Sequence, residues 1–139
     1  MVQTGDADPD GKVHGYVPKG KSSERKIPLE IAVKDENELL YGSTTEDSEI
    51  GYVATELPFQ SYGALGMARG EYENDSASSQ FFWLLFESDL TPAGKNMLDG
   101  RYSCFGYTTD GADLLKDVKE GDVIQSVKVV KGIENLQRR

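Results

Sequence analysis

The residue whose type and position most clearly suggest chemistry is Gln80, which stands between two serines and a run of apolar residues. A side-chain amide donates and accepts hydrogen bonds, as recognition of a peptide backbone requires. Residues 81–86, FFWLLF, continue without a polar interruption, which is typical of a strand buried on both faces or nearly so. The stretch predicts either the floor of a peptide groove or a core strand with a polar cap, and this motif alone favours the core strand.

A second candidate is a phosphate-binding loop at residues 15–22, GYVPKGKS, which matches the pattern G-x-x-x-x-G-K-S. That pattern binds phosphate where it joins a strand to a helix, because backbone amides at the start of the helix hold the anion. Here a turn-rich acidic loop precedes the motif, and Pro28 follows within two turns. A P-loop nucleotide site around Lys21 is therefore the least favoured hypothesis.

Metal and nucleophile chemistry find little support. Residues 6–11, DADPDG, copy the opening of a calcium loop, but the position that should carry a bidentate glutamate is Val17. His14 is the only histidine and Cys104 the only cysteine, so the chain offers no zinc cluster and no internal disulfide. We predict no metal and no cofactor.

The composition limits the remaining function classes. The chain has 139 residues, enough for one core, and we assign residues 1–139 to a single domain. Acidic residues outnumber basic ones by 24 to 15, and the net charge of −9 argues against a nucleic-acid partner. The longest apolar run, residues 81–86, is strand-sized, so we predict no membrane insertion.

The elements that would position these residues are mostly strands. Apolar and alternating segments separated by glycine- and proline-rich loops predict many strands and a barrel or sandwich. One amphipathic stretch, residues 113–118, predicts a short helix capped by Asp110 or Asp113. Residues 34–52 are acidic and irregular, which predicts a surface excursion. The expected strands cover residues 2–4, 27–33, 62–68, 81–86, 102–107 and 122–130.

Four separated pieces together resemble the cyclophilin family of peptidyl-prolyl cis-trans isomerases. Residues 2–6, VQTGD, are similar to the family's Q-G-G-D strand end, and residues 65–68, LGMA, to its L-S-M-A strand. SQFF at residues 79–82 matches S-Q-F-F, and LDGRYSCFG at residues 98–106 resembles L-D-G-K-H-V-V-F-G. The order and spacing agree apart from longer loops, and the branch most similar is the large cyclophilins of the plant thylakoid lumen.

The resemblance implies a mainly β fold, a closed antiparallel barrel of about eight strands with capping helices. It also implies that this chain carries only part of the domain, without its first strands and first helix. A groove on the outer wall would bind proline-containing peptides or client proteins, with Phe82 facing the groove while Phe81 and Trp83 turn into the barrel. The substrate-binding residues implied by the resemblance are Gln3, Met67, Ala68, Arg69, Gln80, Phe82, Met97, Leu98 and Tyr102.

The family's catalytic arginine lies upstream, in an F-H-R strand that this chain lacks, so no catalytic residue is identifiable here. Met97 stands where the family has tryptophan and Tyr102 where it has histidine, so a cyclosporin-like ligand would bind more weakly. The main hypothesis is a peptidyl-prolyl cis-trans isomerase of the chloroplast thylakoid lumen. The alternative is a non-catalytic proline-peptide binding or chaperone module that uses the same groove.

Overall fold

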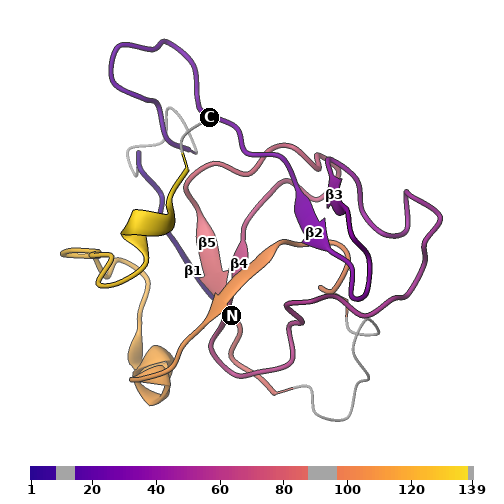
Figure 1. Cartoon of the computed structure of the whole chain (residues 1–139). Coiled ribbons are helices and arrows are strands. Elements are labelled where there is room, and N and C mark those ends of the chain that lie inside the picture. The colour runs from indigo at the N-terminus through magenta and orange to yellow at the C-terminus, as the bar shows by residue number, and fades with distance from the viewer. Residues whose placement is uncertain (9–14, 88–96, 138–139) are drawn as a thin grey trace.

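The fold is mainly β, as the sequence predicts, with antiparallel strands and two short 3-10 helices (Figure 1). The structure is a computed structural model that describes residues 1–8, 15–87 and 97–137. None of the helices in these ranges is long and apolar enough to cross a membrane. The elements are β1 Val2–Thr4, β2 Glu30–Ala32, β3 Leu39–Tyr41, β4 Ala64–Met67, β5 Phe81–Trp83, β6 Cys104–Tyr107, η1 Ala112–Asp117 and η2 Ile133–Asn135.

The main sheet has four strands in the order β1-β5-β4-β6, and every neighbouring pair is antiparallel. Strand β5 lies between β1 and β4, so its Phe82 is opposite Gln3 on one side and Gly66 on the other. This pairing brings the amino-terminal strand beside a segment about eighty positions further along the chain. The strands β2 and β3 form a separate two-stranded sheet.

The core of the main sheet lies on the face that carries Phe82. Phe82 is 2% exposed and its ring stacks on Phe59 with a centroid distance of 5.8 Å. Phe81 and Trp83, half-buried, lie on the other face and contact each other edge to face. Burial among the described residues therefore differs from the expected pattern, because Phe82 is buried whereas Phe81 and Trp83 are only half-buried. An unbroken apolar run has no alternation from which the buried face could be read.

Gly66 of β4 permits this packing. A Cβ atom at that position would lie 2.5 Å from Phe82 Cζ and 2.7 Å from Phe59 Cε1, far inside van der Waals contact. The sequence predicts a close backbone approach in this glycine-punctuated strand, and the structure confirms it. Two aromatic rings pack directly on the strand's backbone.

The second sheet has its own small core of Leu29, Ile31 and Val33, all buried. The expected strand at residues 27–33 is shorter than predicted, since Ile27 and Val33 make only isolated bridges. The expected surface excursion at residues 34–52 is wrong in part, because it contains β3, which closes a hairpin with β2. Leu40 supplies the apolar side chain that pairs with Ile31.

Two other expected elements differ. The run at residues 81–86 is a strand only to Trp83, and Phe86 is 54% exposed. Residues 122–130 form no strand and are exposed throughout, and no described strand pairs with them. The expected helix is the 3-10 helix η1, and its cap is Gly111 in a left-handed conformation rather than an aspartate side chain.

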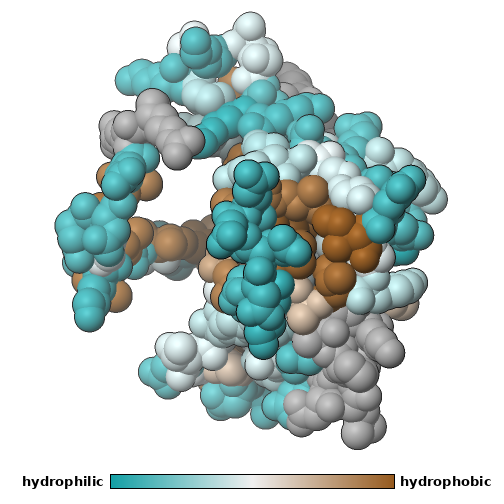
Figure 2. All heavy atoms as spheres, turned by 45° about the vertical axis from the view of Figure 1, so that its right-hand side comes forward, coloured by the Kyte–Doolittle hydropathy of each residue, from teal (hydrophilic) through white to brown (hydrophobic). Residues whose placement is uncertain are grey.

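In Figure 1 the carboxy-terminal part of the chain reaches away from the sheets. Figure 2 shows hydrophobic residues at the surface, bordered by hydrophilic ones.

The close contact at Gly66 predicts a selective loss of stability. We expect Gly66→Ala to lower the free energy of unfolding by about 1–3 kcal/mol, because the added methyl group overpacks the core. The control is Gly106→Ala in β6, where an added Cβ would meet only Leu65 Cδ1 at 3.9 Å. That variant should stay within about 0.5 kcal/mol of the parent. Urea unfolding measures both, and equal stability of the two variants would contradict the packing described.

Candidate functional site

Two glutamine side chains meet at the edge of the main sheet. Gln3 Nε2 donates to Gln80 Oε1 at 2.8 Å, which fixes how both amides are oriented. Gln3 lies in edge strand β1 and Gln80 directly precedes β5, so the pairing of these strands brings them together. Beyond β4, the amide of Ala68 donates to the carbonyl of Gln80 at 3.0 Å. These bonds place three predicted site residues at one place.

A wide hollow of about 550 Å³ opens over these residues. Its lining combines amides, hydroxyls and charges of both signs, and Lys26 and Glu73 approach each other across it at 4.0 Å. Both of these side chains are largely exposed, so their attraction is weak. The residues that line the hollow are Gln3, Glu24, Lys26, Ala68, Arg69, Gly70, Glu73, Ser76, Ser78 and Gln80.

An apolar cluster adjoins the glutamine pair. The Tyr102 ring stands almost perpendicular to that of Phe82, with a centroid distance of 5.9 Å. Leu98, Tyr102 and Ala68 are half-buried and pack against the core cluster that contains Phe82. The amide of Tyr102 donates to the carbonyl of Leu98 at 3.0 Å, which holds their turn together. The structure thus joins the polar and the apolar groups that the sequence singles out.

Arg69 lies between the two groups. It lines the hollow, yet its guanidinium carbon stands 4.7 Å from the centroid of the Tyr102 ring. The side chain therefore faces the apolar cluster, and the expected peptide edge at residues 68–69 would be formed by backbone.

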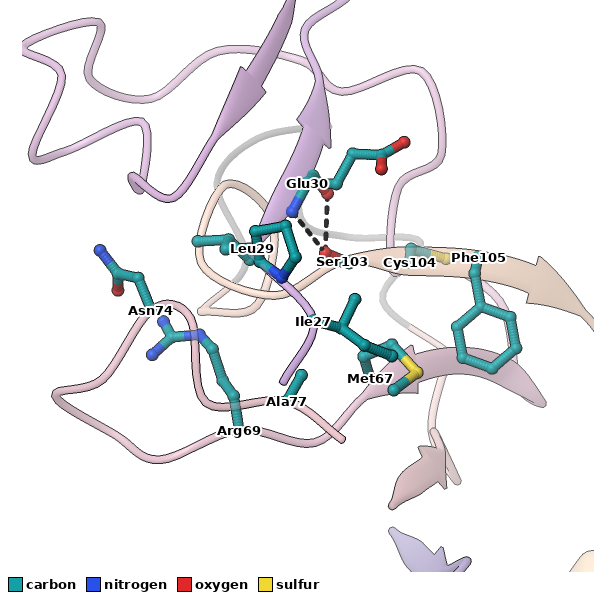
Figure 3. A pocket seen from close by; sticks show the side chains of 11 residues that line it. Ile27, Leu29, Glu30, Met67, Arg69, Asn74, Ala77, Ser103, Cys104 and Phe105 are labelled. Carbon is teal, nitrogen blue, oxygen red and sulfur yellow. Dashed lines mark hydrogen bonds between the residues drawn. The ribbon is translucent and has the colours of Figure 1, made fainter. Parts of the chain in front are cut away.

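Met67 lies apart from this site, which corrects its expected position beside Phe82. Side chains alternate along a strand, and Met67 is opposite Phe81, so both point to the other face of the sheet. Met67 lines a separate cavity of about 170 Å³, and Figure 3 shows it there near Phe105, with Arg69 on the opposite side. The structure also separates Met97, whose side chain is 84% exposed and which borders another hollow with Tyr52.

The sequence analysis does not identify two residues that support the site. Phe59, 1% exposed, stacks under Phe82, but it follows Pro58 in a segment without periodicity, so no pattern reveals it. Asp99, 7% exposed, accepts a hydrogen bond from the Phe59 amide at 2.7 Å. Its place in the L-D-G motif was the available sign of a structural role. The bond ties the turn that carries Leu98 to the core.

The other candidate motifs form no site in the described residues. No helix follows the phosphate-loop pattern, since residues 15–29 include neither a helix nor a strand and only Ile27 makes an isolated bridge. His14 and residues 9–11 of the calcium-like segment lie outside the described residues. Across residues 1–8, 15–87 and 97–137, no three potential ligand side chains are grouped to hold a metal.

The only cysteine is not poised as a nucleophile. Cys104 is half-buried behind the Phe82 cluster, and this burial raises the pKa of its thiol above the ordinary value. Its Sγ lies 3.8 Å from the carbonyl oxygen of Gly106. Because only the thiolate is a strong nucleophile, the site lacks an activated sulfur at neutral pH.

The comparisons with known proteins all match the same family. The sequence model of the family described as "Cyclophilin type peptidyl-prolyl cis-trans isomerase/CLD" matches residues 1–137. The chain is 51% identical over 136 residues to the chloroplastic peptidyl-prolyl cis-trans isomerase CYP38 of Arabidopsis thaliana, covering 98% of this chain and 31% of that protein. It is 46% identical to a provisionally named thylakoid lumen peptidyl-prolyl cis-trans isomerase of Synechocystis sp., covering 98% of this chain and 35% of that protein.

A third relative is the chloroplastic peptidyl-prolyl cis-trans isomerase CYP37 of Arabidopsis thaliana, 35% identical over 121 residues, which cover 84% of this chain and 25% of that protein. The chain thus spans about a third or less of the length of these relatives.

The burial of Cys104 predicts slow thiol chemistry. A raised pKa means that the folded protein holds the thiol protonated at pH values where the unfolded chain already forms thiolate. We expect a disulfide reagent such as DTNB to react faster with the urea-unfolded protein than with the folded one at pH 8. In the folded protein the rate should climb at a higher pH than in the unfolded protein. Equal rate profiles in the two states would show that the thiol is exposed and unperturbed.

Proposed function

Because this chain belongs to the cyclophilin family of peptidyl-prolyl cis-trans isomerases, we propose that it binds X-Pro peptides at the Gln3–Gln80 edge and promotes their isomerisation. Residues 1–139 would form part of the isomerase domain. The family binds proline-containing peptides in general. Since the relatives are about three times longer, this activity in the whole protein and its clients are part of the proposal.

The reaction needs no acid, base or metal. The barrier to X-Pro rotation, roughly 18–20 kcal/mol, arises from the resonance of the planar amide. A catalyst lowers it by binding the twisted amide more tightly than either planar form. An apolar surface that holds the proline ring, together with hydrogen bonds that hold the neighbouring backbone, can favour the twisted form.

The observation that carries the proposal is the adjacency of the oriented glutamine pair and the apolar cluster. Gln3 and Gln80 border the open hollow, and Phe82, two residues after Gln80, belongs to the cluster beside it. We propose that the two amides bond to the peptide backbone, with residues 68–69 offering a further backbone edge. This arrangement supplies polar and apolar contacts to the two sides of one X-Pro bond.

Within the apolar cluster, burial suggests a division of roles. Phe82 is 2% exposed and would form the floor, whereas the half-buried Leu98 and Tyr102 would contact the proline ring. We assign no catalytic donor among the residues of this chain. Met67 and Met97 are left out of the proposed site, because they lie on other surfaces.

The chief alternative is a proline-peptide binding or chaperone module without catalysis. The exposure of Met97, 84%, favours it in one respect, because that side chain does not close the apolar cluster. A cyclosporin-like ligand would accordingly bind weakly. The names of two relatives, chloroplastic and thylakoid lumen, support a location in the chloroplast thylakoid lumen.

A protease-coupled proline-isomerisation assay on the full-length protein tests the proposal. We expect Gln80→Ala to lower kcat/KM about tenfold, which corresponds to a loss of about 1.4 kcal/mol, within the range for one hydrogen bond. The matched control is Gln125→Ala, an exposed glutamine in the carboxy-terminal segment, which should retain the parent's rate.

The outcomes separate the hypotheses. Background rates in the parent, together with proline-peptide binding that Gln80→Ala abolishes, would support the non-catalytic module. Background rates without peptide binding would refute both. Calorimetry with ATP and magnesium should give no heat of binding, and heat that disappears in Lys21→Ala would instead support the nucleotide hypothesis.

A further inference from the structure

We infer that the side chain of Arg69 is a positioning residue that holds Tyr102 in place, rather than a group that contacts the peptide. This inference rests on the proposed function, since it concerns the apolar wall of the same site. An arginine beside a groove would ordinarily be expected to attract an acidic peptide. The contacts of this guanidinium point to another role.

The guanidinium is occupied by backbone carbonyls of the protein. Nε and Nη2 both donate to the carbonyl of Arg101, at 2.9 and 2.6 Å. Nη1 donates to the carbonyls of Gly70 and Glu71, at 2.8 and 3.1 Å. The side chain therefore ties the loop after β4 to the turn before β6, which lies 32 positions further along the chain.

The same group fixes the aromatic ring. The guanidinium carbon lies over the Tyr102 ring at 4.7 Å, and that ring stands almost perpendicular to Phe82. The carbonyl that accepts both hydrogen bonds from Nε and Nη2 of Arg69 belongs to Arg101, the residue directly before Tyr102. The Arg69 side chain thus holds both the backbone next to Tyr102 and the Tyr102 ring, while Phe82 packs against the ring from the core.

This arrangement accounts for why arginine occupies the position. A guanidinium is a planar fork that can bond a carbonyl with two N–H groups and stack on an aromatic face at once. A lysine carries the same charge but can do neither in this way. Holding Tyr102 before the peptide arrives removes part of the ordering cost of binding, so the expected gain is in peptide affinity.

The test compares Arg69→Lys and Arg69→Gln with a neighbouring arginine in the full-length protein. Arg101→Gln is the matched control, because that side chain is exposed and pairs with Glu46 while its carbonyl remains in place. NMR of labelled tyrosine rings, without peptide, reports the ring-current shift that Phe82 causes at Tyr102. We expect both Arg69 variants to lose this shift and Arg101→Gln to keep it.

Peptide binding supplies the second readout. We expect the Kd for an Ala-Pro peptide to rise about three- to tenfold in Arg69→Lys and Arg69→Gln alike. In a Tyr102→Ala background, Arg69→Gln should add no further loss, because two residues that act as a unit are not additive. Far-ultraviolet circular dichroism confirms that each variant is folded.

Three results would overturn the inference: an unchanged Tyr102 shift in folded Arg69→Gln, full affinity in Arg69→Lys, or additive losses in the double variant. The last two would instead indicate a direct charge contact with the peptide. If even the parent binds no proline peptide, the proposed function fails, and the Tyr102 shift alone still decides the positioning role.

Discussion

The packing of Phe82 and Phe59 on the bare backbone of Gly66 is the contact on which the rest of the structure depends. Any Cβ at position 66 would collide with both rings, so the sheet can reach this aromatic pair only through a glycine. With Phe82 held there, β5 is fixed between β1 and β4, and Gln80 is brought within hydrogen-bonding distance of Gln3. A steric constraint inside the core thereby determines the geometry of a polar site at the surface.

Residues around the site also hold its loops in place. Asp99 bonds the Phe59 amide and so ties the turn with Leu98 to the core. Arg69 bonds the carbonyl before Tyr102 from the other direction. Leu98 and Tyr102, which are proposed to contact the proline ring, are thus held by side chains that do not contact it. Such prior ordering suits a reaction whose barrier is a twist about one bond, since only the twisted amide should gain from the fit.

The sequence predicted the mainly β class and the strand at residues 2–4 from local pattern and family motifs. It could not assign the buried face of β5, because the run around Phe82 contains no alternating polar residue. The family resemblance placed Met67 beside Phe82, whereas the strand register puts it opposite Phe81, on the other face of the sheet. Residues 122–130 alternate as a strand should, but β structure requires a hydrogen-bonding neighbour, which periodicity cannot supply. Phe59 carried no local pattern, and only tertiary packing reveals it.

The central claim is that one X-Pro unit sits with its backbone at the glutamine pair and its ring on the adjoining apolar cluster. Intermolecular nuclear Overhauser effects between a labelled Ala-Pro peptide and the protein test this directly. The account predicts contacts from the proline ring to Leu98 and Tyr102. Contacts to Met67 and Phe105 instead, on the opposite face of the sheet, would contradict it.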